Sequence, residues 1–516
     1  MTGASERAAS PGQPASLLAA FRERAESDSE ATFVSALDGG QWSYGQIAGH
    51  VDLLAEAIGI APFSPVIGAY GGNNAMSVIA LLAAWQAGRC LACCGRQVPA
   101  DAARPLFELA GCATVLAEDV APFAGGPWQA LPTGSTAPSG ETAHAAGSAG
   151  PVGSGEFACI CFTSGTTGKP KAVTMTHRHL VEQAVRLTAA PGKPGGWRPR
   201  VGVGRPVVSF SPFGHNGFQS WLGMALWLGR GLVLIDKFSV DAAVAAVARF
   251  APPTLTLTPT MIQMLATAPG QVELPGVKSV TSSTAPLAPD IKELFSARFG
   301  IPILQAYGMT EFGNVAKEHL ADVLAGRQPR GSVGRVSPGR EVRIVGDDGA
   351  PLGPGEEGKL LVRATGRAAP PGDVAVGPDG WFDTGDRGAL TSDGILIVSG
   401  RTSDRIIVGG FNVVPAEVEL EIRGSGLVID AVVVGLPDDR LGEVPVAGVV
   451  WKGDDRQADL LAGLRHTVAH YKLPRRFFSL TEIPRTPYGK VDRKKAAELA
   501  RTLLGAETIR SSDARR

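Results

Sequence analysis

Short apolar strands alternate with helices through residues 157–308 of this 516-residue chain, and this alternation constrains the fold more than any other feature. Runs typical of buried strands, such as FACICF at 157–162, VVSFSP at 207–212 and TLTLTP at 254–259, are each followed by a helical pattern. Strands that recur at this spacing are joined by crossover helices and therefore form parallel sheets. Such sheets bind ligands in the loops at the carboxyl ends of their strands. We predict an α/β fold with its chemistry in those loops.

The remaining sequence patterns predict further structural units. Residues 133–155 are rich in Gly, Ser, Ala and Pro without periodicity, which is typical of a mobile surface connection. Strand patterns at 342–349 and 394–400 lie among many Gly and Pro residues and predict a β subdomain. We therefore predict a large N-terminal domain at 1–400, made of parallel α/β sheets plus this β subdomain. A small α+β C-terminal domain is predicted at 401–516.

The chain has no charge excess, because Lys and Arg together number 49 and Asp and Glu together also number 49. A balanced chain has no global field that attracts nucleic acid or an anionic membrane, so we expect neither as a partner. The opening residues lack the basic head and apolar run of a secretory signal. The most apolar stretch, 76–94, is interrupted by Gln86, Gly88 and Arg89. We therefore expect a cytoplasmic protein.

Three of the six cysteines are crowded together at Cys90, Cys93 and Cys94. Crowding raises the question of a metal or redox site, but no His or second Cys pair stands nearby at zinc spacing. The run is apolar and follows a helical pattern, a context in which cysteine serves as a small buried hydrophobic residue. We interpret these cysteines as part of the core.

A Gly-rich loop, Thr-Ser-Gly-Thr-Thr-Gly-Lys-Pro-Lys, follows the first of these strands at 163–171. Glycine lets backbone N–H groups turn toward an anion, and hydroxyls with lysines complete a phosphate cradle. The loop lacks the spacing of a Walker A motif, and a flexible surface turn is the alternative. Four hydroxyls and two lysines within nine residues favour phosphate binding.

Four further segments carry chemical groups at predicted strand ends and turns. Ala-Tyr-Gly-Met-Thr-Glu at 306–311 offers a ring for a purine, a hydroxyl for a phosphate and a carboxylate for magnesium. Trp-Phe-Asp-Thr-Gly-Asp at 381–386 ends in a carboxylate that suits ribose hydroxyls, and Gly-Arg-Thr-Ser-Asp stands at 400–404. A proline-stiffened loop at 484–493 presents Lys490. Each segment alone could equally be a turn or a solvated charge pair.

In this order and spacing, the five segments resemble those of the acyl-adenylate-forming superfamily, which includes acyl-CoA and aryl-CoA synthetases, carrier-protein ligases and luciferases. The resemblance runs from about residue 15 to about residue 500. The segments at 209–215 and 282–287 are similar to the family's acyl-site and pocket-loop segments. The resemblance implies an ATP-dependent ligase that adenylates a small carboxylic acid, releases pyrophosphate and transfers the acyl group to a thiol, expected to be CoA.

The resemblance also implies roles for individual residues, carried over position by position. Lys490 is the implied catalytic lysine, Thr310 contacts a phosphate, Glu311 is a Mg²⁺ ligand, and His215 lies beside the acyl site. The implied binding residues are Thr163, Ser164, Gly165, Thr166, Thr167, Gly168 and Lys171 at the phosphates, Ser283, Thr284 and Ala285 in the pocket loop, Tyr307 and Gly308 at adenine, Asp386 and Arg401 at ribose, and Gly409 and Gly410 along the acceptor tunnel.

The implied reaction explains these residue types. A carboxylate attacks the α-phosphorus of ATP, pyrophosphate leaves, and charge builds on phosphoryl oxygens, so cations must be fixed there. Lysine supplies a movable charge and Mg²⁺ neutralises the departing pyrophosphate. The family rotates its small C-terminal domain between the two half-reactions, and the pivot is expected within 400–410. The acceptor, CoA or a carrier protein, would come from outside the chain.

Departures from the family's pattern bear on the substrate. Ser283 and Thr284 stand where Gly or Ala is common, and Ala306 replaces a common Gly. Filled, hydroxyl-bearing walls suit a short or aromatic acid with polar substituents rather than a long chain, so we expect an aryl acid. His215 could gate this pocket or be a buried structural histidine. Ser403 stands at the pivot, where Asp or Lys is usual, and its effect on domain rotation stays open.

Two other interpretations remain. A catalytically silent AMP-binding protein would be expected to lack Lys490 or Glu311, and both are present. A same-fold ATP-dependent enzyme could use a nucleophile other than a carboxylate or an acceptor other than a thiol, such as an amine. The sequence does not identify the acid, the acceptor, the pathway or the oligomeric state.

Overall fold

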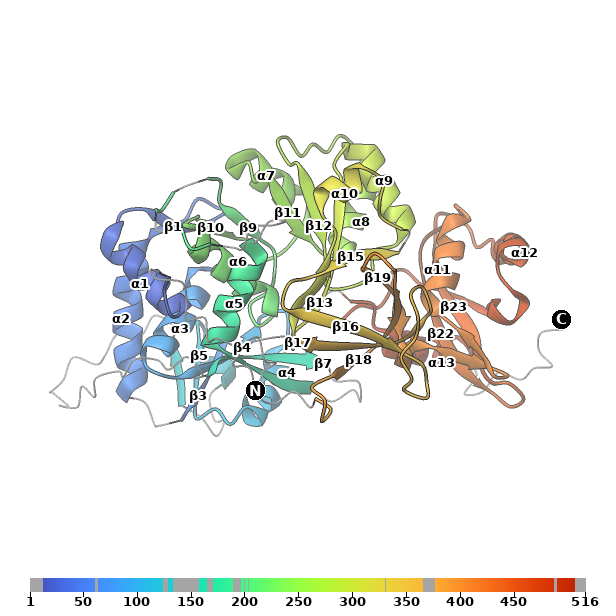
Figure 1. The fold of residues 1–516 in the computed structure, drawn as a ribbon, viewed down its shortest axis with the longest axis horizontal. Helices are drawn as coiled ribbons and strands as arrows, with labels where there is room; N and C mark the ends of the chain where they lie inside the picture. The colour runs from blue at the N-terminus through green and yellow to red at the C-terminus, as the bar shows by residue number, and fades with distance from the viewer. Residues whose placement is uncertain are drawn as a thin grey trace, which may run out of the picture.

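The computed structural model describes residues 13–60, 64–123, 129–132, 157–164, 170–188, 196–198, 200–202, 204–329, 331–364, 376–486 and 490–505. Figure 1 shows a broad N-terminal part and, beside it, a smaller C-terminal part drawn in orange and red. Within these ranges no helix is both long and apolar enough to cross a membrane. The connection predicted at 133–155 lies outside the described residues.

A six-stranded sheet with strand order β6-β5-β3-β4-β7-β8 forms the first layer of the N-terminal domain. Its strands are parallel except for β8, which pairs antiparallel with β7. Successive side chains of a strand point to opposite faces. Cys93 accordingly packs in the core that α2, α3, α5 and α6 share, whereas Cys90 and Cys94 pack with α4. The elements are α2 (Tyr44–Ile60), β3 (Val66–Gly71), α3 (Ala75–Gln86), β4 (Cys90–Gly95), α4 (Ala100–Leu109), β5 (Thr114–Ala117), β6 (Gln129–Pro132), β7 (Phe157–Ser164), β8 (Pro170–Thr176), α5 (His177–Thr188) and α6 (Asn216–Leu228).

A four-stranded sheet with order β2-β1-β10-β9 lies next to this layer. Its parallel strands β9 and β10 come from the predicted alternating region and pair with each other, and β10 also pairs with β1 near the start of the chain. The alternation therefore contributes to more than one sheet. The elements are α1 (Leu17–Ser27), β1 (Thr32–Ala36), β2 (Gln41–Ser43), β9 (Val207–Ser209), β10 (Leu232–Leu234) and α7 (Val240–Phe250).

A nine-stranded sheet joins the last parallel strands to the β subdomain, in the order β11-β12-β13-β14-β15-β19-β18-β17-β16. β11, β12 and β13 are parallel, and the pairings from β13 onward are antiparallel. The end of β13 thus lies at the change from parallel to antiparallel pairing. The elements are β11 (Thr254–Leu257), α8 (Pro259–Thr267), β12 (Ser279–Ser282), α9 (Pro289–Phe299), β13 (Ile303–Met309), β14 (Gly313–Lys317), α10 (Leu320–Leu324), β15 (Ser332–Val336), β16 (Arg340–Val345), β17 (Gly358–Ala364), β18 (Phe382–Leu390) and β19 (Ile395–Arg401).

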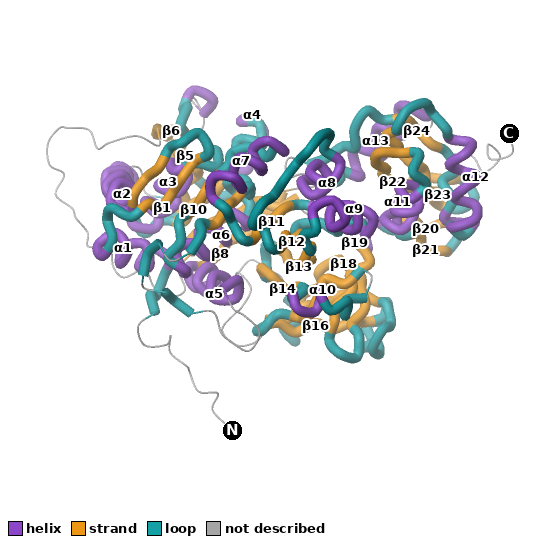
Figure 2. Tube along the Cα trace, turned by 90° about the horizontal axis from the view of Figure 1, so that it is seen from above, coloured by secondary structure: helices purple, strands orange, loops and turns teal. Residues whose placement is uncertain are grey.

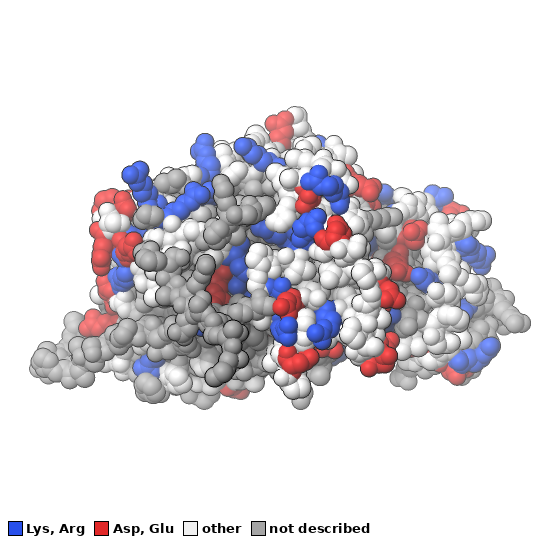
Figure 3. Space-filling model, in the orientation of Figure 1, with Lys and Arg blue, Asp and Glu red and all other residues white. Residues whose placement is uncertain are grey.

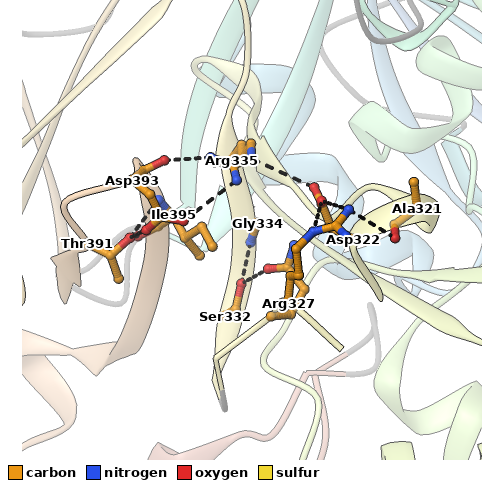
Figure 4. A network of polar contacts seen from close by, with 10 residues as sticks. Ala321, Asp322, Arg327, Ser332, Gly334, Arg335, Thr391, Asp393 and Ile395 are labelled. Carbon is orange, nitrogen blue, oxygen red and sulfur yellow. Dashed lines mark hydrogen bonds and ion pairs between the residues drawn. The ribbon is translucent and has the colours of Figure 1, made fainter. Parts of the chain in front are cut away.

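Arg335 on β15 connects α10 to the turn before β19 (Figure 4). Its guanidinium lies 3.7 Å from Asp322 Oδ2 and 3.6 Å from Asp393 Oδ2, and it donates to the Asp393 carbonyl at 2.5 Å. Arg327 donates to the other Asp322 oxygen at 2.7 Å. The partners are partly exposed, so each ion pair contributes at most about 1 kcal/mol, and the network mainly links α10 to the turn between β18 and β19.

The C-terminal domain is built around the long hairpin of β22 and β23. Val433 and Ala447 face α11 and α12, whereas Val432 and Val446 face α13, so both faces of the hairpin are buried. Figure 2 shows this domain beside α8 and α9. The elements are β20 (Ile406–Val408), β21 (Phe411–Val413), α11 (Pro415–Gly424), β22 (Val428–Asp438), β23 (Gly442–Trp451), α12 (Gln457–Thr467), β24 (Phe477–Ser479) and α13 (Arg493–Leu504).

The predicted fold class is confirmed: a large N-terminal domain of α/β sheets with a β subdomain, followed by a smaller α+β domain. The division at residue 400 stays a prediction. The balanced charge is visible in Figure 3, where acidic and basic side chains are interspersed over the coloured surface.

Candidate active site

Three polar side chains meet where β13, β18 and β19 lie close together. The hydroxyl of Tyr307 donates to Asp386 Oδ2 at 2.5 Å, and Arg401 Nε lies 3.1 Å from Asp386 Oδ1. Asp386 and Arg401 are cross-strand partners of β18 and β19. The Thr384 hydroxyl accepts a hydrogen bond from the Asp386 N–H at 3.0 Å and donates to the Leu360 carbonyl at 2.8 Å, which fixes the backbone before Asp386. Both carboxylate oxygens are therefore held by partners within the protein.

The electrostatic surroundings keep Tyr307 a donor. Burial raises the pKa of the Tyr307 hydroxyl well above its ordinary value, and the charge of Asp386 raises it further. Burial also raises the pKa of Asp386, which is only 7% exposed, but Arg401 and the Tyr307 hydroxyl oppose this by stabilising the carboxylate. Tyr307 therefore retains its proton near neutral pH.

Lys490 comes from the C-terminal domain, but its charge interacts with charged groups of this cluster. The surrounding protein lowers the pKa of Lys490, chiefly through burial and then through the charge of Arg401. The charges of Asp386 and Glu311 act in the opposite direction. Lys490 is nonetheless exposed to solvent. Its backbone is held by Thr486, whose N–H donates to the Lys490 carbonyl at 2.7 Å.

His215 caps the N-terminus of α6. Its Nδ1 accepts a hydrogen bond from the Gly217 N–H at 3.0 Å. Burial, with a smaller contribution from the charge of Lys490, lowers the pKa of His215 to about 4. The imidazole is therefore neutral near pH 7. Both sequence interpretations of His215, a pocket residue and a structural cap, fit this position.

The Gly-rich loop joins the antiparallel strands β7 and β8. Thr163 is directly opposite Lys171, which is exposed, and Ser164 is opposite Pro170. The sequence predicts that the segment between these strands binds phosphate. Gly165, Thr166, Thr167 and Gly168 lie outside the described residues, as does the side chain of Ser164.

The pocket loop begins at the end of β12. Ser283 donates its N–H to the Leu257 carbonyl at 3.3 Å, which places the loop beside β11. Thr284 has a φ of +79° and Ala285 is half-buried. A left-handed backbone is rare for a β-branched residue and costs on the order of 1–3 kcal/mol. Thr284 is thus held in a strained conformation at a predicted pocket position.

Thr310 and Glu311 form the turn between β13 and β14, and both are half-buried. A Cβ atom at Gly308 would lie 2.4 Å from the Gly313 carbonyl oxygen, so the close approach of the two strands requires glycine there. Among the described residues, no group of three or more His, Cys, Asp or Glu side chains could hold a metal ion. Glu311 offers a single carboxylate, which suits Mg²⁺ because this ion is usually held by one or two carboxylates together with substrate phosphates and water.

Gly409 and Gly410 form the tight turn between β20 and β21, with φ values of +55° and +89°. Both are exposed, and the Gly409 N–H donates to the Leu441 carbonyl at 2.7 Å. The predicted tunnel role of the two glycines stays a prediction.

The C-terminal domain contacts the first turns of α8 and α9. Arg485 donates from Nη1 to Thr260 Oγ1 at 2.8 Å and from Nη2 to Asp430 Oδ2 at 3.0 Å. Arg423 Nε lies 3.7 Å from Asp290 Oδ2. Thr260 and Asp290 belong to the N-terminal domain and the other three residues to the C-terminal domain, so the two domains are joined by polar contacts at this edge.

The sequence analysis did not assign these interdomain residues. Arg485 lies five positions before Lys490 and pairs across their loop with Val491. It belongs to the segment predicted to present Lys490, so its position could have indicated a role in placing that lysine. Thr260 carries no signal beyond its place at a strand end.

Comparisons with known proteins give relatives over most of the chain. The AMP-binding enzyme family model matches residues 21–369, and the AMP-binding enzyme C-terminal domain model matches residues 417–490. Sulfoacetate–CoA ligase of Cupriavidus necator is 33% identical over 347 residues, covering 66% of this chain and 66% of that protein. Indoleacetate–CoA ligase of Aromatoleum aromaticum is 34% identical over 352 residues, also covering 66% of each. These matches span just under two thirds of the relatives' own length.

A solved structure extends the similarity to the whole fold. MatB from Rhodopseudomonas palustris with ATP bound superimposes with a TM-score of 0.80, covering 96% of this chain and 100% of that chain at 22% sequence identity. At this identity the likeness shows the fold alone, and the chemistry must be argued from the residues themselves.

Proposed function

Because the chain belongs to the AMP-binding enzyme family, we propose that it is an ATP-dependent ligase that adenylates a small carboxylic acid and transfers the acyl group to a thiol. One observation carries the proposal: Lys490 of the C-terminal domain lies in the electrostatic neighbourhood of Glu311, Asp386 and Arg401 of the N-terminal domain. Cationic and anionic groups from separate domains meet at strand ends, as adenylate formation requires.

The Tyr307–Asp386–Arg401 group suits the nucleoside. The ring of Tyr307 can stack on adenine, and the carboxylate of Asp386 can accept hydrogen bonds from the ribose hydroxyls. Arg401 and Tyr307 already orient this carboxylate, so little freedom is lost when ribose binds. The Gly-rich loop at 163–171 and Thr310 would bind the phosphates.

Lys490 suits the first chemical step. As the acid's carboxylate oxygen bonds to the α-phosphorus and the bond to pyrophosphate breaks, negative charge grows on the phosphoryl oxygens. An ammonium group fixed beside them stabilises this charge more than it stabilises the ground state. Glu311 would hold Mg²⁺, which when bound neutralises phosphate charge.

The acid is proposed to be small and aromatic. Ser283 and Thr284 place hydroxyl-bearing side chains in the pocket loop, and a neutral His215 lies at the start of α6. Walls of this kind leave little length for an aliphatic chain. The relatives that act on sulfoacetate and indoleacetate support a small acid without identifying it.

CoA is proposed as the acceptor because both relatives are CoA ligases. A thiolate would attack the acyl carbon and release AMP. A carrier protein or an amine would use the same adenylate, so the acceptor is a separate question from the first step.

The experiment is a screen of small acids for acid-dependent release of pyrophosphate from ATP, run with and without CoA. The proposal expects AMP and pyrophosphate with one or more acids, and an acyl-CoA product when CoA is present. Release of ADP and phosphate, or no acid-dependent turnover with any acid, would refute it. Adenylate formed without acyl transfer to CoA would refute only the acceptor.

A further inference from the structure

A buried polar patch lies on α5, between the first turn of α6 and the turn that carries Glu311. Gln183 donates from Nε2 to Ser220 Oγ at 2.6 Å and to Asn216 Oδ1 at 3.3 Å, so it is fixed against α6 directly after His215. A Cβ atom added at Gly313 would lie 3.6 Å from this same nitrogen. The patch is therefore bordered by two elements of the candidate active site.

Arg186 lies one turn further along α5 and faces the same gap. Its Nη2 would be 3.8 Å from a Cβ atom at Gly313, two residues after Glu311. The side chain is 12% exposed, and its nearest carboxylate, Glu182, is 3.7 Å from Nη1, which is too long for a hydrogen bond. Glu182 is shared, because its other oxygen accepts from Arg178 Nε at 3.1 Å. One carboxylate thus serves two guanidinium groups.

Positive charge exceeds negative charge in this patch. Arg340, 6% exposed, donates twice to the Phe312 carbonyl, at 3.1 and 2.6 Å, and so carries a third guanidinium to the turn after Glu311. Burial and the charge of Arg186 lower the pKa of Arg340 to about 10. Three arginines therefore lie near one glutamate, and an uncompensated buried cation is costly unless an anion joins it.

Several polar atoms of the patch have no partner among the described residues. They are Arg186 Nε and Nη2 and Gln183 Oε1, and Gln183 is only 4% exposed. Buried polar atoms are nearly always hydrogen-bonded, so the two unpartnered guanidinium nitrogens of Arg186 indicate a missing acceptor. Gln183 Oε1 is itself an acceptor and does not bind an anion. A planar guanidinium with two available N–H groups matches the geometry of a carboxylate or a sulfonate.

We propose that Arg186 binds a second anionic group on the acid substrate, at the end remote from the carboxylate that is adenylated. This inference rests on the proposed function and narrows its substrate to small acids that carry a second carboxylate or a sulfonate. The reacting carboxylate lies toward His215 and Lys490, and the remote anion lies between α5 and Gly313. Asn216 and Ser220 contribute a polar wall along the way.

The test compares matched acids in the pyrophosphate-release assay. Terephthalate carries a second carboxylate, 4-sulfobenzoate a sulfonate, and 4-acetylbenzoate neither; succinate, 3-sulfopropionate and monomethyl succinate form the shorter set. The wild-type protein is expected to use the anionic members with a kcat/KM about 10- to 100-fold above the neutral ones, the scale of one charge-assisted contact. Whichever of the carboxylate-bearing and sulfonate-bearing acids gives the higher kcat/KM identifies the preferred anionic group of the substrate.

Variants separate binding from a structural role. Arg186→Gln is expected to remove the preference for the anionic acid while leaving the neutral acid's kcat/KM within about threefold, and Arg186→Lys to restore part of it. Arg249→Gln, at an exposed position on α7 outside the patch, removes the same charge and should keep the preference. The inference is wrong if the wild type shows equal kcat/KM for neutral and anionic acids, or if Arg186→Gln lowers kcat/KM equally for both classes. If no acid releases pyrophosphate, the proposed function fails instead.

Discussion

The hydrogen bond between Arg485 and Thr260 should favour the first half-reaction over the second. Arg485 Nη1 donates to Thr260 Oγ1 at 2.8 Å across the domain boundary, and the same arginine precedes Lys490 in its loop. Thr260→Val removes the hydroxyl and keeps the side-chain shape, so the hydrogen bond that holds the lysine loop against α8 is lost. The adenylate-forming arrangement of the domains becomes less populated.

The magnitude follows from the charge and exposure of the pair. A hydrogen bond to a charged group contributes about 1.5–3 kcal/mol when buried. The Arg485 side chain is 26% exposed, so solvent reduces this to about 1 kcal/mol. A loss of about 1 kcal/mol corresponds to a roughly fivefold smaller equilibrium constant for closure. Arg485→Ala also removes the contact with Asp430 and should reduce closure further.

The assay measures each half-reaction on its own. Thr260→Val should slow acid-dependent adenylate formation about fivefold and leave acyl transfer from a supplied acyl-adenylate unchanged. Thr267→Val is the matched control, since its hydroxyl bonds the Gln263 carbonyl at 2.9 Å within the same helix. A Thr260→Val protein with normal adenylation, or with both half-reactions slowed equally, would refute the reasoning.

Three further predictions follow from individual side chains. Glu311→Gln should raise the Mg²⁺ concentration needed for half-maximal pyrophosphate release, because a charged oxygen is removed; an unchanged magnesium dependence would contradict this. Thr284→Gly should admit bulkier acids without loss of thermal stability, since glycine accepts a φ of +79° freely, and an unaltered acid profile would place Thr284 outside the pocket. Burial lowers the pKa of His179 to about 3, so below pH 6.5 the unfolded chain binds more protons than the folded chain, and stability decreases as the pH is lowered. His179→Gln should therefore make the free energy of unfolding fall less steeply between pH 7 and pH 4. A slope equal to that of the exposed control His466→Gln would contradict this.

Local patterns predicted the type of most secondary-structure elements but not their neighbours. The runs at 207–212 and 254–259 are both apolar, and nothing in either specifies that the first pairs with β10, in the sheet that contains β1, and the second with β12. Pairing depends on contacts between distant segments, which periodicity does not record. β8 was missed for a local reason: its first residues, Pro170 and Lys171, are exposed and read as part of the Gly-rich loop.

Part of the candidate site could likewise be predicted from local sequence, and part could not. Tyr307, Asp386, Arg401 and Lys490 were found because each stands in a segment with recognisable turn chemistry, and the structure brings them together. Arg186 and the residues around it were missed because they lie within an ordinary amphipathic helix. Their significance comes from burial and from unpaired donors, which require coordinates.

The central claim is that Lys490 of the C-terminal domain serves adenylate formation and not acyl transfer, and a pair of half-reaction measurements on Lys490→Ala tests it most directly. The account predicts that adenylate formation falls by roughly 10² to 10³, the scale for loss of one preorganised charge, while transfer from a supplied acyl-adenylate to CoA stays within about threefold of wild type. Lys494→Ala, an exposed lysine on α13, should leave both rates unchanged. Equal loss in both half-reactions, or normal adenylate formation without the lysine, would contradict the account.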